Sequence, residues 1–260
     1  MEKSLDSLVR YLFYDTIPTM DTAALQLGAR FALGPNQLGY CGRGTAPEKF
    51  KRCLTTGNCA GVKEEFSKFI VFYPYLRTLS YLTKLDRYSY PVMEAYWLGN
   101  DQLKKANTDH YEILISYFSR QGVPGWLINE LKNKKPKVFI PFHLFQTLHV
   151  GVGRASSAVP FNLESINNCM VKWGTLLKVN GKQKQVSVRL NMLEKSQDAK
   201  YKLIQSDQVV SFSPALIGEL KKGDMVAVHW KMVAKKLKSN EVANLSLWTR
   251  KVLETVEPSL

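Results

Sequence analysis

The stretch GDMVAVHW, residues 223–230, contains a turn followed by a β-strand. Its Gly-Asp pair favours a turn, and from Met225 onward apolar side chains fall at every second position. Successive side chains of a strand point to opposite faces, so Val226 and Val228 share one face and His229 lies on the other. The stretch therefore predicts a strand with one apolar face and one face that carries a histidine.

The segments around this strand predict further strands and a final helix. Asn180-Gly181, a strong hairpin signal, precedes an alternating segment at residues 186–190. Residues 202–212 predict another strand or strand pair, and Ser213-Pro214 predicts a single helical turn. Ser239 begins an amphipathic helix. We therefore expect residues 165–257 to form a small β-barrel, of the OB or SH3 type, closed by a C-terminal helix.

The first part of the chain has a different pattern. Residues 1–160 contain apolar side chains at helical spacing, such as Leu8, Leu12 and Phe13. Residues 33–61 are dense in Gly, Pro and Cys, which predicts a long ordered loop, and loops of that length usually carry function. The expected fold class is therefore α+β, with a helical domain over residues 1–160 followed by the small barrel.

Composition narrows the class of protein. The 260 residues are 45% apolar, with 36 Lys and Arg against 22 Asp and Glu, a net charge of +14. This charge is spread along the chain and suits an acidic partner or nucleic acid. No run of 18 uncharged apolar residues and no apolar signal core is present, so we expect a cytoplasmic protein without a membrane span. Four cysteines in such a chain are expected to be thiols.

Cys169 and His229 form the first candidate site. Cys169 stands at the start of the expected first strand of the barrel, and His229 ends a later strand. Strand ends that are far apart in sequence can converge in a small barrel. A thiolate and an imidazole suit a soft transition-metal fragment, or form a Cys–His nucleophile pair. The plainer interpretation is a buried cysteine and a hydrogen-bonded strand histidine, because the separation of the two residues matches no standard metal spacing.

A series of short phrases accompanies this pair. They are Cys169, GTLLKVNG at 174–181, GDMVAVH at 223–229, AKKL at 234–237, Glu241 and the helix at 245–253. In this order they resemble the HypC/HupF family, the small chaperones of NiFe-hydrogenase maturation. The resemblance covers about 167–256, and GDMVAVH is its most specific phrase.

This resemblance implies a function. Family members are small barrels with a helical tail that bind an iron fragment carrying cyanide and carbon monoxide through a cysteine and a histidine. By position, Cys169 and His229 match those two ligands. The implied partners are a maturation scaffold protein and the hydrogenase large subunit, between which the fragment passes. We therefore expect an accessory chaperone without turnover of its own, whose helical domain docks a partner.

A second candidate site lies in the helical domain. Cys41 falls in LGPNQLGYCG at 33–42, and His143 and His149 fall in PFHLFQTLHVG at 141–151. Together with EAYWLGN at 94–100, these phrases resemble an uncharacterised two-domain family of unknown function. If the loop folds over the helices, the thiol and the two imidazoles form a metal or cofactor site. The alternative is a loop packed by aromatic side chains, with histidines that satisfy backbone carbonyls. The spacing of Cys53 and Cys59 does not favour a zinc site.

Two lysine-rich runs support an alternative function. One run contains Lys134, Lys135 and Lys137, and the other contains Lys235, Lys236 and Lys238. Such runs can neutralise phosphates, and a basic barrel with aromatic side chains can stack bases. The alternative is therefore a module that binds tRNA or single strands with no metal role. The simpler interpretation is that these lysines only form a solvated surface, because aromatic residues are not interleaved with them.

Common catalytic motifs are missing from the sequence. It contains no Walker A loop, no Gly-x-Gly-x-x-Gly, no Gly-x-Ser-x-Gly, no His-Glu-x-x-His and no Cys-x-x-Cys. This weakens the case for an enzyme, and a binding or carrier protein is expected. An enzyme that uses the Cys41, His143 and His149 pocket is the third alternative.

Overall fold

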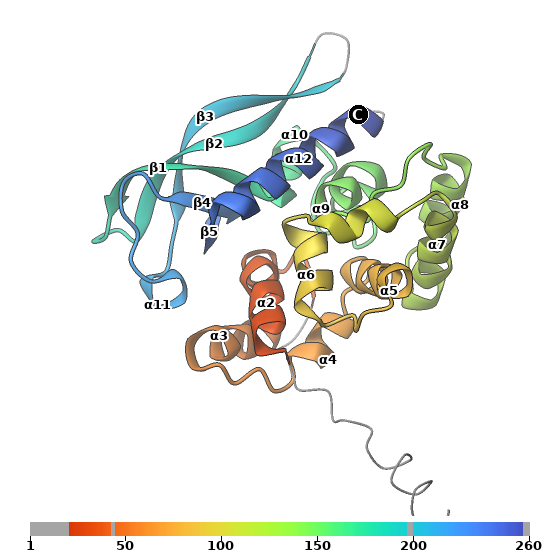
Figure 1. Ribbon diagram of the computed structural model, residues 1–260, viewed down its shortest axis with the longest axis horizontal. Helices are drawn as coiled ribbons and strands as arrows, with labels where there is room; N and C mark the ends of the chain where they lie inside the picture. The colour runs from red at the N-terminus through yellow and green to blue at the C-terminus, as the bar shows by residue number, and fades with distance from the viewer. Residues whose placement is uncertain (1–20, 43–44, 197–199, 257–260) are drawn as a thin grey trace, which may run out of the picture.

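The computed structural model describes residues 21–42, 45–196 and 200–256. Leu8, Leu12 and Phe13, on which part of the helical prediction rested, lie outside these residues. The described chain begins with a helical region and continues with a closed sheet and a long C-terminal helix (Figure 1). The predicted α+β class is confirmed.

Short helices make up the first part. They are α2 (Thr22–Gln37), α3 (Ala46–Thr56), α4 (Val62–Ser67), α5 (Phe72–Thr83), α6 (Tyr90–Trp97), the 3₁₀ helix η1 (Asp101–Lys105), α7 (Asp109–Gln121), α8 (Gly125–Asn133), α9 (His143–Phe145), the π-helix η2 (Gln146–Gly151) and α10 (Leu163–Cys169). Asp21 joins two of them. Its carboxylate accepts from the backbone N–H of Ala24, which caps α2, and from that of Tyr90 at the start of α6.

Five strands form the closed sheet. They are β1 (Lys172–Asn180), β2 (Gln185–Lys195), β3 (Tyr201–Ser211), β4 (Met225–His229) and β5 (Met232–Lys236), in the order β1-β2-β3-β5-β4. Pairing of β1 with β4 closes the ring, and the short contact between β3 and β5 is parallel. The single turn α11 (Pro214–Ile217) and the helix α12 (Ser239–Thr255) complete the fold.

The alternation in β4 separates two cores. Val226 and Val228 face the interior of the closed sheet, where they join Leu176, Val186 and Leu190. Side chains on the opposite face of β4 belong to the larger core, which also contains the helices and α12. In Figure 1, α12 crosses the middle of the molecule, between the strands and the helical region. The two parts therefore share one continuous core, and His229 lies on the face of β4 that looks into it.

The predicted loop over residues 33–61 is wrong. Helix α2 continues to Gln37 and α3 begins at Ala46, so most of this segment is helical. Gly34 lies where α2 crosses the sheet, and a Cβ added there would lie 3.4 Å from the carbonyl oxygen of His229 and 3.3 Å from Met232. The glycine therefore serves close packing inside a helix. Pro35 falls in the last turn of this helix, where it removes one backbone hydrogen bond.

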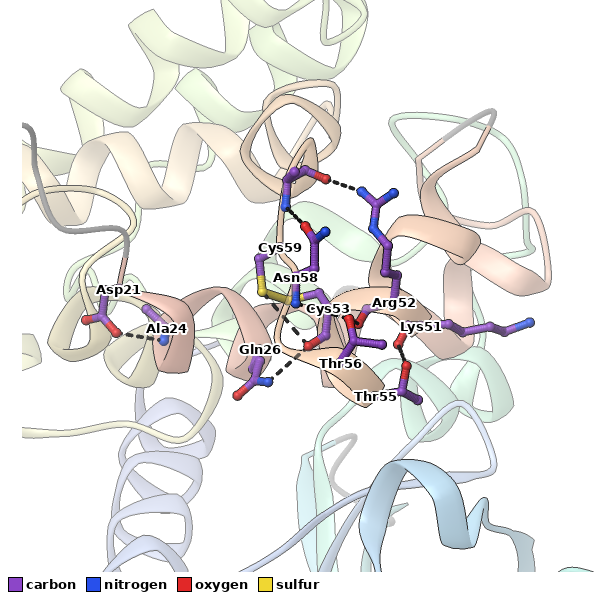
Figure 2. Close-up of a disulfide and its surroundings, with 11 residues drawn as sticks. Asp21, Ala24, Gln26, Lys51, Arg52, Cys53, Thr55, Thr56, Asn58 and Cys59 are labelled. Carbon is purple, nitrogen blue, oxygen red and sulfur yellow. Dashed lines mark hydrogen bonds between the residues drawn. A yellow bond between two sulfur atoms is a disulfide. The ribbon is translucent and has the colours of Figure 1, made fainter.

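The prediction that all four cysteines are thiols is also wrong. Cys53, near the end of α3, forms a disulfide with Cys59 in the following loop, and both are buried (Figure 2). Gln26 of α2 donates to the carbonyl of Cys53 at 2.9 Å, which ties this loop to the first helix. Cys41 and Cys169 remain free.

Reduction of this disulfide is expected to destabilise the fold. A disulfide that closes so short a loop lowers the conformational entropy of the unfolded chain and thereby raises the free energy of unfolding by about 2 kcal/mol. For a chain of this size, that corresponds to about 4–8 °C in Tm. Thermal unfolding with and without a reductant measures the effect. In the Cys53→Ala/Cys59→Ala double variant the reductant should cause no shift, since the other two cysteines are thiols. An unchanged Tm for the wild-type chain would contradict the prediction.

Candidate metal site

His143, Cys169 and His229 meet between the helical region and the sheet. A ligand atom from each lies within 4.8 Å of the other two, and none of the three side chains is more than 5% exposed. The His143 and His229 rings stand nearly perpendicular, with centroids 5.2 Å apart. The structure therefore brings together both residues of the first candidate site and one residue of the second.

His229 is oriented by an unusual feature of α2. Its Nδ1 lies 2.7 Å from the carbonyl oxygen of Phe31, so Nδ1 carries the proton and donates it. That carbonyl would normally accept from the N–H four residues later, but that residue is Pro35, which has no N–H. The proline thus leaves the carbonyl available to His229. The other ring nitrogen, Nε2, is buried with no hydrogen-bond partner among the described residues.

Cys169 is the last residue of α10, not the first residue of a strand as predicted. Asn162 caps this helix by accepting from the N–H of Ser165, and β1 begins only at Lys172. The helix end is joined to the end of β4 because the carbonyl of Asn168 accepts from the N–H of Trp230 at 2.8 Å. This backbone link places the thiol beside the β4 histidine. Residues 163–169 form a helix because Asn162 stands directly before them as an N-cap, and this signal is present in the sequence.

His143 begins α9 and is held at both nitrogens. Its Nε2–H donates to the carbonyl of Cys169 at 2.8 Å, and its Nδ1 lies 2.9 Å from the hydroxyl of Tyr96. Thr147 donates to the carbonyl of His143 and also lies 3.6 Å from the Cys169 sulfur. Thr147 belongs to the π-helix η2, a geometry that is frequent at functional sites. His143 can therefore bind a metal only by giving up one of these contacts, whereas His229 has a free lone pair.

Burial keeps the cluster electrically neutral. It raises the pKa of the Cys169 thiol to about 12, although Thr147 and the Trp230 indole partly oppose the rise. It lowers the pKa of His143 to about 4 and that of His229 well below the usual value. At neutral pH the site thus consists of one thiol and two uncharged imidazoles, and a cation that enters must displace the thiol proton.

The three residues line a cavity of about 560 Å³. Aromatic rings form much of its wall, including Trp97, whose ring centroid lies 4.5 Å from that of His143 and 5.5 Å from that of His229. Within the described chain the lining contains no carboxylate. Its one ammonium group, Lys68, is paired with Glu65 at 3.0 Å. Residues 94–100 stood out in the sequence as part of a resemblance, but nothing in that segment indicated that Trp97 lines a cavity.

The second candidate site is divided. Cys41 lines the same cavity as Cys169, and His143 has joined the cluster. His149 lies elsewhere, where its Nε2 is 2.9 Å from the hydroxyl of Tyr111 and its ring packs on Phe145. The π-helical turn lies between the two histidines, and the structure brings Cys41 and His143 to one cavity but does not bring His149 there.

The two lysine runs lie apart. Lys137 shares a groove with the end of α12, and Lys238 directly precedes its first residue, so the length of a 17-residue helix, about 25 Å, separates them. Four of the lysines form ion pairs: Lys134 with Glu130, Lys135 with Glu112, Lys235 with Glu241 and Lys236 with Asp224. The runs therefore do not form one continuous basic stripe. No described helix is long and apolar enough to cross a membrane.

Comparisons with known proteins add one finding. Residues 20–260 match the model of a family described only as a family of unknown function, DUF6390. No curated protein and no solved structure matches the chain.

Proposed function

Since the chain belongs to the family of unknown function DUF6390, membership brings no activity with it, and we propose from the residues that it binds a transition metal in its cavity. The cargo is held by Cys169 and His229, with His143 as a third ligand. The protein then acts as an accessory carrier for a metal centre. The observation that carries this proposal is the unpartnered Nε2 of His229 beside a free thiol.

The donor set suits a soft or borderline metal. A buried nitrogen without a hydrogen-bond partner costs free energy, and metal coordination would remove that cost. Thiolate and imidazole are the ligands that Zn, Cu and low-spin Fe prefer over Mg or Ca. The Phe31 carbonyl fixes the His229 tautomer from the second shell of the site, as is usual for metal-binding histidines.

The size of the cavity favours a metal that brings other ligands with it. A bare ion fills only the small space between its donor atoms. The cavity, with about 560 Å³, has room for several small ligands in addition. An iron fragment carrying cyanide and carbon monoxide fits this description, in keeping with the resemblance of GDMVAVH to the HypC/HupF phrase. A hydrogenase maturation scaffold or large subunit would be the partner, and transfer would require the cavity to open. A cytoplasmic location, expected from the sequence, belongs to the same proposal; a reducing compartment keeps Cys169 a thiol and would also act on the Cys53–Cys59 disulfide, which is buried.

Loss of either ligand should abolish metal binding. We expect Cys169→Ala and His229→Ala each to weaken Co²⁺ binding by on the order of 100-fold or more, because loss of an outer-shell partner alone costs 10–100-fold. Titration followed by visible absorption measures the affinity. His110→Gln is the matched control, since this histidine lies on α7, outside the cavity, and should bind as the wild type does. Unchanged affinity in both cavity variants would refute the site.

The nature of the cargo is tested separately. The chain is co-expressed with the hydrogenase maturation machinery, purified and examined for infrared bands of cyanide and carbonyl. Bands that disappear in both variants support the iron fragment, and bands that survive in both exclude this site as its carrier. If Co²⁺ binds but no bands appear, the protein carries a different metal.

A further inference from the structure

We propose that Cys41 supplies a second thiolate to this site and takes the place of His143 as third ligand when the cargo is a bare divalent ion, which is then held by Cys41, Cys169 and His229. This rests on the proposed function, because it concerns the same cavity. The inference adds Cys41 to the residues of the site. It also distinguishes a bare ion, which needs both thiolates, from a metal fragment with its own anionic ligands, which needs only Cys169.

The position of Cys41 supports this assignment. Its residue lines the same cavity as Cys169, and the charge of Cys169 adds to burial in raising the pKa of Cys41 to about 12. The backbone is held from α2, because the side-chain amide of Asn36 donates to the carbonyl of Cys41 at 2.6 Å. The neighbouring Tyr40 packs its ring on Trp230, with centroids 4.6 Å apart. The segment that carries the thiol is thus held beside the cavity through its backbone and through Tyr40, while these contacts leave the Cys41 side chain itself unrestrained.

Charge balance requires a second anion when the cargo is a bare ion. A divalent cation bound to one thiolate and neutral imidazoles leaves a net charge of +1 in a buried, largely apolar cavity, which is costly. Among the described lining residues there is no carboxylate, and the ammonium group of Lys68 is paired with Glu65. Cys41 is the remaining thiol of the wall, and its thiolate makes the site neutral. A fragment with cyanide ligands brings its own negative charge and needs Cys169 alone.

Binding then proceeds without any redox change. Two S–H bonds break, two metal–sulfur bonds form, and two protons leave for solvent, while the lone pair of His229 Nε2 completes a third bond. The Cys41 sulfur is not part of the group whose atoms lie within 4.8 Å of one another, so it has to move toward the metal. The turn at residues 38–42, between α2 and α3, is the segment that carries this movement.

Proton counting during titration with Zn²⁺ tests the inference. The full chain should release two protons per ion in weakly buffered solution, and Cys41→Ser should release one. We expect the affinity of Cys41→Ser to fall by about 10–100-fold, and its thiolate-to-Co²⁺ charge-transfer absorption to fall by about half. Cys41 is only partly buried, and serine is close to it in volume, so the variant should fold.

The outcomes separate this inference from the proposed function. One proton released by the wild type, with unchanged affinity in Cys41→Ser, overturns the second thiolate and leaves the Cys169 and His229 site in place. No binding of Zn²⁺ or Co²⁺ to the wild type overturns both. Proton release by the wild type needs no substitution, so it decides the question even if the variant is unstable.

Discussion

Acidification from pH 6.5 to pH 4 is expected to remove at least about 5 kcal/mol from the free energy of unfolding. His143 is buried and His149 is half-buried, and burial is the main cause that lowers the pKa of each to about 4, from 6.5 for an exposed histidine. Below pH 6.5 these two imidazoles therefore take up protons only in the unfolded chain, and His229, whose pKa burial also lowers, adds to the effect, so stability falls as pH falls. Each of the two groups contributes at most about 1.4 kcal/mol per pH unit, and about 2.5 kcal/mol over this window. Since domains have 5–15 kcal/mol in total, unfolding is expected near pH 4.

Urea unfolding at a series of pH values measures this effect. Between pH 6.5 and 5 the histidines act alone, because the carboxylate with the best-defined shift, Glu130, has its pKa lowered by Arg154 to about 2 and loses its contribution only in stronger acid. Glutamine at position 149 can keep a hydrogen bond to Tyr111. In His149→Gln, the slope of unfolding free energy against pH should therefore correspond to one proton fewer taken up on unfolding. A flat profile between pH 6.5 and 5 would mean that these histidines are not buried in the neutral form.

The parts of the fold that the sequence predicts are those with local signals. The alternation of side chains along β4 correctly predicted that Val226 and Val228 lie on one face, in the core of the closed sheet, and that His229 lies on the opposite face, beside Trp97. Asn180-Gly181 marked the β1–β2 hairpin correctly. Gly34 and Pro35 misled the prediction, because their usual effect is to end helices, and here they allow close packing and leave a carbonyl for His229. Only the tertiary contact shows that purpose.

The site was harder to predict for the same reason. Cys169 and His229 were paired through a resemblance and through the alternation of one strand, and the structure places them together. His143 was assigned to the wrong group because its partners come from α6 and α10, which are distant in sequence. The structure has the buried cysteine and the hydrogen-bonded histidine of the plainer interpretation, and the site rests on what that interpretation did not include, the approach of the two side chains to one another.

Gly174→Ala is expected to disrupt both the sheet and the site. In β1, Gly174 pairs with Leu190 of β2 on one side and with Val226 of β4 on the other. A Cβ at this position would lie 1.9 Å from the carbonyl oxygen of Arg189, which is backbone and cannot rotate away. Overpacking of this kind costs about 3 kcal/mol, or about 6–12 °C in Tm.

The site is affected because the β1–β4 pairing is what holds Cys169 beside His229. Lys172, three residues after the cysteine, pairs with Val228, one residue before the histidine. A shift of β1 to relieve the Arg189 contact therefore moves the thiol relative to the imidazole, and we expect Co²⁺ affinity to fall together with Tm. Gly181→Ala is the matched control, since nothing lies within 4 Å of a Cβ there, at the tip of the same hairpin. Equal Tm values for the two variants would show that β1 tolerates a side chain at 174. Equal losses of Co²⁺ affinity would show that the register of β1 does not position the ligands.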